Sequence, residues 1–266
     1  VVESPYDVRD YQIVAGKDFP ETFELPKKVN IKNQWAKPTC VAYALSSLVE
    51  YHNLIETGKY RKFSTEFIYG TRDIGYYIGD GMVIRDALKT VRKYGDCYYI
   101  DCPGNHDTVD AMKNVNENVE KYRDLAYPHR IGSYYRVRTP EEIKTALMNH
   151  GPVVISMTCK KGAYISNDIY RYPQNAKDSG VHCVLIVGWN ENGWVIQNSW
   201  GTLYAGDGYF TLPFDFKIDE AWGATDQKDD YSLLKRSPRN TFMNKVYEII
   251  NKIVNWFYSR KKQKES

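Results

Sequence analysis

The sequence predicts an α+β fold in which a helical half precedes a half rich in β-strands. Between residues 41 and 57, good helix formers dominate and apolar side chains recur at helical spacing. From Val153 onward, the apolar runs are short and β-branched, as in buried strands. The 266 residues suffice for one large domain or for two lobes that share a core.

Composition excludes some classes of function. The formal net charge of +3 is spread over mixed acidic and basic residues, which does not indicate a nucleic-acid-binding surface. No apolar run is long enough for a transmembrane helix, and the chain opens with VVESP, which lacks the pattern of a signal peptide. We therefore expect no nucleic-acid partner and no membrane span, while the compartment stays open.

The first predicted elements are helices with recognisable ends. The helix over 41–57 ends at Gly58, a residue suited to a left-handed cap. Ser64 is placed to cap a short helix. A glycine loop at 79–81 then leads into an amphipathic helix that ends at Gly95.

The middle of the chain is less regular. Residues 96–135 are rich in tyrosine, with a helical stretch around 108–122, and we expect them to cross between the two halves. His106 and His129 are interpreted as surface residues, because neither has ligand spacing to another histidine. A further helix is predicted over 139–150, with proline at its first position.

Cys40 stands where a proline-containing loop meets the first helix. Free backbone N–H groups and the helix dipole stabilise a thiolate there and lower the cysteine pKa. An unpaired cysteine is more often a small buried hydrophobic residue, so this chemistry needs a base. His182 opens a predicted strand and Asn198 ends the next one; their ordinary interpretations are a core histidine and a turn residue.

Taken together, these motifs resemble those of the papain-like cysteine peptidases. The shared features are Gln34 ahead of Cys40, a His-x-Val motif before a strand, and Asn-Ser-Trp-Gly-Thr at 198–202. The resemblance covers roughly residues 20 to 226, and the motif style is closest to bacterial and viral members. It implies a helical lobe with a central cysteine-bearing helix, an antiparallel barrel-like β lobe, and an active site in the cleft between them.

The resemblance implies catalytic roles for four residues. Cys40 would be the nucleophile and His182 the base, together forming a thiolate–imidazolium pair. Asn198 would orient the imidazole, and Gln34 would bind the oxyanion together with the backbone N–H of Cys40. Trp200 would shield the bond between His182 and Asn198 from water.

The resemblance also implies a set of substrate-binding residues. Gly81 would bind the backbone of an extended peptide, although a plain turn glycine is the alternative. Val83, Cys183 and residues near Ala224 would line an apolar pocket for the second residue before the cut, which predicts a hydrophobic preference there. The substrate-binding residues predicted in this way are Gly81, Met82, Val83, Cys183, Trp200 and Tyr204.

Three positions depart from the family pattern. Lys37 stands where the family has a disulfide-forming cysteine. Val41 replaces an aromatic residue after the nucleophile, and Tyr204 replaces a second tryptophan on the leaving side of the cleft. The shape of the leaving side is therefore left open.

The other cysteines do not establish an oxidising compartment. Cys97 and Cys102 are close enough in sequence to pair, but unpaired thiols fit equally well. Cys159 and Cys183 are expected to be core residues on strands.

We predict three segments along the chain. Residues 1–19 form an N-terminal arm or the remnant of a pro-segment, 20–226 the catalytic domain, and 227–266 a C-terminal extension. The helical lobe is placed at about 33–135 and the β lobe at about 136–226.

The C-terminal extension contains a basic amphipathic helix over 241–258. Charged residues interrupt it, so it is not expected to span a membrane. It would lie on an anionic membrane surface, contact another protein, or pack on its own domain.

The function expected from this resemblance is a cysteine endopeptidase that hydrolyses proteins or peptides through an acyl-enzyme thioester. A proteinaceous inhibitor or a pro-segment is a further expected partner, and neither a metal nor a cofactor is expected. One alternative is a papain-fold protein that binds peptides without cutting them. Another is a transpeptidase or acyl transferase that uses the same thioester.

Overall fold

A computed structural model of the protein describes residues 1, 3–5, 7, 10–26, 29–72, 79–102 and 119–228. In this part of the chain, the helices come first and most of the strands follow, so the predicted α+β order is confirmed. The predicted helix over 241–258 and His106 lie outside the described residues.

The helices begin and end at the residues that local chemistry favours. The longest, α1, ends at Gly58 in the left-handed conformation, and Ser64 caps the next helix by accepting a hydrogen bond from the Phe67 N–H. Thr139 and Glu142 form a capping box at the start of α6. The helices are α1 (Cys40–Thr57), α2 (Thr65–Gly70), α3 (Ile84–Tyr94), α5 (Val119–Ala126) and α6 (Pro140–His150), with 3₁₀ turns η2 (Tyr127–His129) and η3 (Tyr204–Gly206).

Within the described residues, nine strands form one sheet in the order β2-β9-β3-β6-β7-β8-β5-β4, and β1 pairs with β6. Neighbouring strands are antiparallel except for β5 and β8. The strands are β1 (Phe23–Glu24), β2 (Ile131–Val137), β3 (Val153–Lys160), β4 (Tyr164–Ser166), β5 (Ile169–Arg171), β6 (Asp178–Asn190), β7 (Gly193–Gln197), β8 (Tyr209–Leu212) and β9 (Ile218–Asp226).

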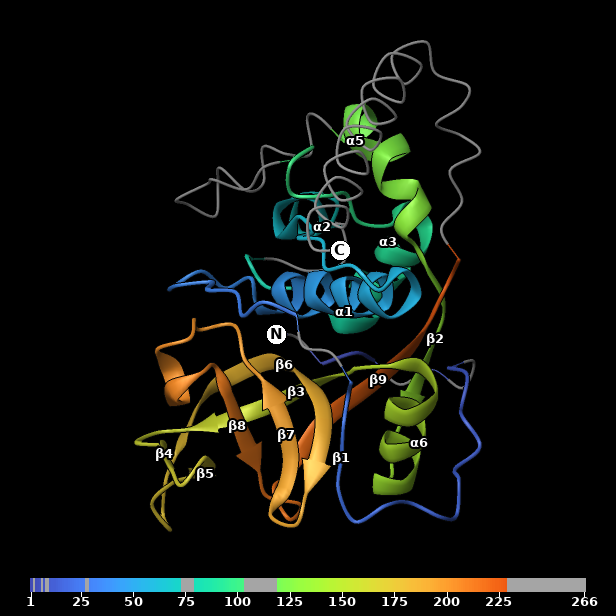
Figure 1. The fold of residues 1–266 in the computed structure, drawn as a ribbon. Coiled ribbons are helices and arrows are strands. Elements are labelled where there is room, and N and C mark those ends of the chain that lie inside the picture. Colours follow the sequence, from blue (N-terminus) through green and yellow to red (C-terminus); the bar gives the residue numbers. More distant parts are fainter. Residues whose placement is uncertain are drawn as a thin grey trace, which may run out of the picture. The chain divides into compact units, whose positions relative to one another are not determined.

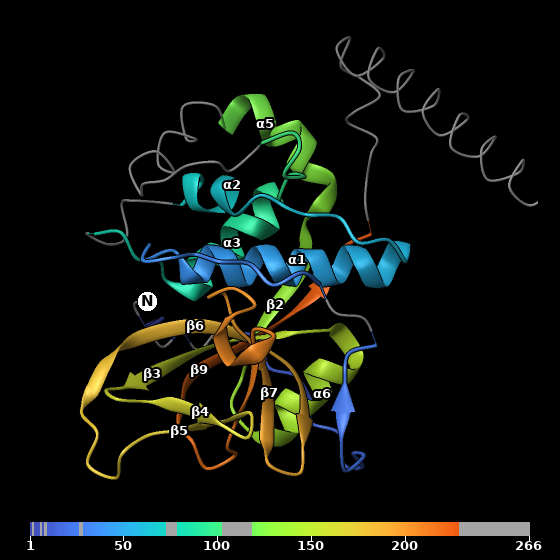
Figure 2. The same ribbon diagram turned by 60° about the vertical axis from the view of Figure 1, so that its left-hand side comes forward.

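The two faces of β3 and β6 are buried in different cores. One core joins α1 and α3 to sheet residues such as Val154 and Leu185. The other joins α6 to residues such as Ile155 and Val184. Figure 1 shows α1, α2, α3 and α5 on one side of these strands and α6 on the other, and the turned view in Figure 2 agrees. The predicted two-lobe arrangement is thereby confirmed.

The N-terminal part of the described chain is attached to the β lobe at Trp189. The Trp189 indole N–H donates to the Pro20 carbonyl at 3.2 Å, and its ring stacks on Phe23 at 4.9 Å between centroids. Gly188 allows this approach, because a Cβ there would lie 2.3 Å from the Phe23 carbonyl oxygen.

Three sequence predictions need correction. Helix α5 runs on to Ala126, beyond the predicted end of the helical stretch at 122. His129 is buried, not exposed, because its ring packs between Phe63 and Tyr98. Cys159 does lie on a strand, but it is only half-buried.

Candidate active site

Cys40 is the first residue of α1 and is 5% exposed. Burial raises the pKa of its thiol, while backbone hydrogen bonds from Cys183 and Val41 oppose that rise. This direction is opposite to the lowered pKa expected for a cysteine at a helix start. Burial therefore acts against the helix-end contribution that favours the thiolate.

His182 lies on β6 and faces Asn198, the residue after the end of β7. Its Nε2 lies 2.8 Å from Asn198 Oδ1, which also accepts the backbone N–H of Ser199. Trp200 stacks on the imidazole at 4.5 Å between centroids with 18° between the rings. Because an amide oxygen accepts, Nε2 carries the proton in the neutral ring and Nδ1 keeps its lone pair.

Burial lowers the pKa of His182 to about 4, although the hydrogen bond to Asn198 acts in the opposite direction. Burial thus disfavours the charged form of Cys40 and of His182 when each group titrates alone. The backbone of Cys183, the residue after His182, forms a hydrogen bond with the Cys40 sulfur. Helix α1 and strand β6 are therefore in contact at this point.

Gln34 is held at both ends of its side-chain amide. Its Oε1 accepts the Ser199 hydroxyl at 2.6 Å, and its Nε2 donates to the Lys37 carbonyl at 2.7 Å. Its backbone N–H also donates to the Ser199 carbonyl at 2.8 Å. Because an amide has two side-chain N–H bonds, one remains for another acceptor.

The predicted substrate-binding residues fall into two groups. Met82, Val83 and Cys183 are buried beside the catalytic helix or strand, and Gly81 lies just ahead of α3. Tyr204 is placed edge-on to Trp200, at 4.8 Å between ring centroids. Trp200 thus connects the histidine to the leaving side predicted from the sequence.

Comparison with known families gives a match to the model described as "Papain family cysteine protease" over residues 19–227. The chain belongs to the papain family of cysteine proteases. The predicted family is therefore confirmed, and the assignment to the cysteine peptidases is confirmed at the level of the family.

Relatives in this papain family come from several kinds of organism. An uncharacterized peptidase C1-like protein of Acanthamoeba polyphaga mimivirus is 26% identical over 76% of this chain and 70% of its own. Cathepsin 7 of Mus musculus is 24% identical over 79% of this chain and 66% of its own. Xylellain, a cysteine protease from Xylella fastidiosa, superposes with a TM-score of 0.74 at 23% identity, over 85% of this chain and 95% of that one.

The N-terminal residues of this papain-family chain lie against both lobes. The backbone nitrogen of Val1 is 3.8 Å from the position that a Cβ on Gly81 would take, and the Val1 side chain packs on the core that contains Cys40. Ser4 donates its backbone N–H to Glu220 at 3.4 Å, and its hydroxyl accepts the Arg85 N–H at 3.3 Å. Figures 1 and 2 both place the N-terminus beside α1 and β6.

Sequence reasoning missed several of these contacting residues. Ser199 contacts Gln34 and Asn198, and Ser4 contacts Arg85 and Glu220, but no local pattern distinguishes these residues. Only the motif around Asn198 could have drawn attention to Ser199, its immediate neighbour.

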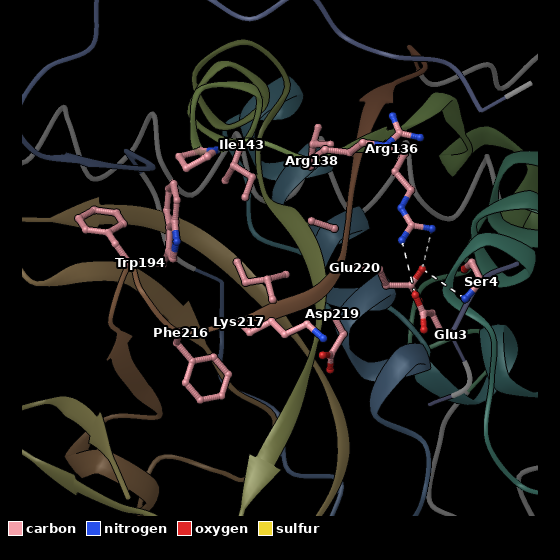
Figure 3. Close-up of a pocket in the computed structure, with 15 residues that line it drawn as sticks. Glu3, Ser4, Arg136, Arg138, Ile143, Trp194, Phe216, Lys217, Asp219 and Glu220 are labelled. Atoms are coloured by element: carbon pink, nitrogen blue, oxygen red, sulfur yellow. Dashed lines mark hydrogen bonds and ion pairs between the residues drawn. The ribbon is translucent and has the colours of Figure 1, made fainter. Parts of the chain in front are cut away.

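A cavity of about 530 Å³ lies near Glu220 (Figure 3). Its apolar end is lined by Ile143, Trp194 and Phe216, and its lining includes none of the four predicted catalytic residues. Within the described residues, no cluster of His, Cys, Asp and Glu side chains could hold a metal ion. None of the described helices is both long and apolar enough to cross a bilayer.

Proposed function

We propose that the protein is an endopeptidase in which Cys40 attacks the substrate carbonyl and forms a thioester that water then hydrolyses. The observation that carries this proposal is the His182–Asn198 bond of 2.8 Å, stacked under Trp200. This bond orients the ring and leaves Nδ1 as the base for the thiol. Papain-family proteases act on proteins, which agrees with the predicted class of substrate.

In this proposal, Cys40 and His182 rest as a thiolate–imidazolium pair. Proton transfer from Cys40 to His182 creates two opposite charges next to each other, whose attraction offsets the cost of burial. The pair therefore titrates as a unit, and its thiolate is the nucleophile that attacks the substrate. Gln34 then donates its remaining N–H to the oxyanion, together with the backbone N–H of Cys40.

The substrate would lie extended along Gly81, with the side chain of its second residue before the cut in the pocket of Val83, Cys183 and Ala224. All three pocket residues are buried, which supports the hydrophobic preference predicted from the sequence. Trp200 and Tyr204 would contact the leaving side of the substrate.

The N-terminal segment predicted at 1–19 would be inhibitory, because Val1 lies next to Gly81. Besides Ser4, the acidic residues Asp7 and Asp10 lie 3.9 and 3.4 Å from Arg85. A substrate would have to displace this segment. The predicted contact of helix 241–258 with a membrane surface or a protein stays a prediction.

The test of the catalytic assignment is the rate at which iodoacetamide labels each cysteine near pH 6, followed by peptide mapping. Cys159 is the internal control, because it is more exposed than Cys40 and burial raises its pKa to about 11. We expect Cys40 to react fastest and His182→Ala to suppress that reaction. Faster labelling of Cys159 than of Cys40, in a folded protein that cuts no peptide, contradicts the proposal.

Analysis of the products that the wild-type protein forms separates hydrolysis from the two alternative functions. Release of free acid from a peptide substrate establishes hydrolysis, whereas amide formation with an added amine establishes acyl transfer. If the protein binds peptides but forms neither product, it is a papain-fold protein that binds peptides without cutting them.

A further inference from the structure

Cys97 and Cys102 lie together in a small buried cluster of the helical lobe, which they share with Phe67 of α2 and Ala126 of α5. Both are unpaired thiols, and their exposed fractions are 0% and 3%. This cluster is separate from the core that contains Cys40. The proposed catalytic chemistry therefore leaves these two thiols without a role.

A tight turn brings the two sulfurs into contact. The backbone N–H groups of Asp101 and Cys102 both donate to the Tyr98 carbonyl, at 3.0 and 3.2 Å. This turn folds the chain back, and the Cys97 and Cys102 thiols form a hydrogen bond with each other. Two cysteines can be bridged without movement of the backbone only when their side chains already face each other, as these do.

Ser64 holds the backbone of both cysteines. Its N–H donates to the Cys97 carbonyl at 2.9 Å, and its hydroxyl donates to the Cys102 carbonyl at 2.7 Å. The same hydroxyl accepts the Phe67 N–H at 3.2 Å and so caps α2, a helix in contact with α1. A covalent bond between the cysteines would therefore fix the turn on which the start of α2 rests.

The two thiols differ in how readily they react. The hydrogen bond with Cys97 lowers the pKa of Cys102, although burial acts in the opposite direction. Burial raises the pKa of Cys97 well above its ordinary value. Because the thiolate is the attacking species in disulfide exchange, Cys102, which is also the more exposed of the two, reacts first.

We propose that Cys97 and Cys102 are a reversible redox site, which oxidised glutathione, a small-molecule disulfide, converts to an internal disulfide that stabilises the helical lobe. This site lies apart from the predicted catalytic residues. The proposal therefore stands or fails independently of the proposed peptidase function.

The oxidation takes two exchange steps. The Cys102 thiolate attacks one sulfur of oxidised glutathione, whose S–S bond breaks, and one glutathione thiolate leaves. Cys97 then attacks the Cys102 sulfur of the mixed disulfide, and the second glutathione thiolate leaves. Two protein thiols are thus oxidised to a disulfide, and one glutathione disulfide is reduced to two thiols, which take up the two protons of the cysteines.

The disulfide should raise the Tm of the protein. It closes a short loop in the unfolded chain, which lowers the entropy of that state, whereas the folded chain already holds the two sulfurs together. For a loop and a chain of these lengths, we expect an increase of about 4 to 8 °C.

The test uses the full chain with Cys40→Ala, which removes the predicted catalytic thiol and its competing reactions. The folded protein is incubated with oxidised glutathione, digested with trypsin and analysed by mass. Residues 94–113, between the cleavage sites at Lys93 and Lys113, form one tryptic peptide that contains Cys97 and Cys102 and none of the other cysteines. We expect this peptide to lose about 2 Da and dithiothreitol to restore its mass. The Tm should rise on oxidation and fall again on reduction.

Two further variants serve as controls. Cys102→Ser should abolish both the loss of mass and the rise in Tm. Cys159→Ser removes a half-buried thiol on β3 and should retain both effects. The main comparison is made on one protein before and after oxidation, so it does not depend on the folding of either control.

The other outcomes overturn the proposal. A gain of about 305 Da in the peptide, from attached glutathione, would show that the second exchange step does not occur. Oxidation of the peptide only after unfolding in urea would show that the folded protein does not use the site. A disulfide that leaves the Tm unchanged or lowers it would contradict the stabilising role.

Discussion

The Ser199 hydroxyl donates a 2.6 Å hydrogen bond to the side-chain oxygen of Gln34, and this bond determines which end of the amide can donate. Together with the bond from Nε2 to the Lys37 carbonyl, it keeps the amide from turning an oxygen, in place of an N–H, towards the oxyanion that we propose forms there. An acceptor there would repel the negative charge of the intermediate.

We therefore expect Ser199→Ala to lower kcat roughly 3- to 10-fold with little change in KM, because the lost bond orients a group that acts in the transition state. Steady-state kinetics with one peptide substrate measures the changes in kcat and in KM separately. Ser199→Thr, which keeps a hydroxyl, is the control and should recover most of the rate. An effect on KM alone would show that Ser199 acts on substrate binding.

Asn198→Ala should slow catalysis less than His182→Ala does. The asparagine orients the ring without transferring a proton, whereas a general base contributes a factor of about 10² to 10⁴. Trp200 still stacks on the histidine in this variant and retains part of the ring's orientation. Single-turnover rates for both variants check the order, and equal losses in folded proteins would assign Asn198 a larger role than orientation.

Acid should destabilise the fold through His52. Burial lowers the pKa of this histidine to about 4, although a carboxylate oxygen of Asp226 lies 3.6 Å from its Nδ1. The Nε2 atom of His52 is 3.1 Å from the His150 carbonyl oxygen. The unfolded chain binds a proton below about pH 6.5, whereas the folded one does not until about pH 4. The contribution of His52 to the free energy of unfolding is therefore fully present above pH 6.5, and it is lost as the pH falls towards 4.

The loss from His52 amounts to at most about 3 kcal/mol of unfolding free energy. Urea unfolding at pH 7 and pH 4.5 measures it, with His52→Gln as the matched variant. Glutamine keeps a donor for the carbonyl but does not titrate, so its stability should depend less on pH. Identical pH dependence in the two proteins means that other groups carry the acid sensitivity.

Ser4→Pro should raise kcat/KM for peptide substrates about tenfold. Proline removes both the N–H that bonds Glu220 and the hydroxyl that accepts from Arg85, which weakens the N-terminal segment without touching the catalytic residues. Val14→Pro is the control, because Val14 is 89% exposed. If both variants have wild-type activity, the segment does not limit access to the cleft.

Local chemistry made much of this fold predictable. Gly58 and Ser64 mark helix ends whatever the rest of the chain does, because capping depends on neighbouring residues. The motifs around Cys40 and Asn198 identified the candidate site for a related reason, since each lies in one short stretch.

Features that depend on distant contacts were not predictable. His129 is buried because Phe63 and Tyr98 close around it, and nothing in its own segment indicates this. The position of Glu220 depends on the register between β3 and β9, and a β-bulge lies beside that position. The direction of the Cys40 pKa shift likewise depends on how completely the two lobes exclude water.

The contacts that complete the site join the two ends of the described chain. Gln34 and Ser199 are 165 positions apart, and Ser4 and Glu220 are 216 apart. Closing such long loops comes late in folding, and a chain emerging from the ribosome exposes Cys40 long before β6, β7 and β9 exist. The nascent protein therefore carries the Cys40 thiol before the predicted base His182 and its partner Asn198 have been made, and we expect it to cut neither its neighbours nor itself until β9 has emerged.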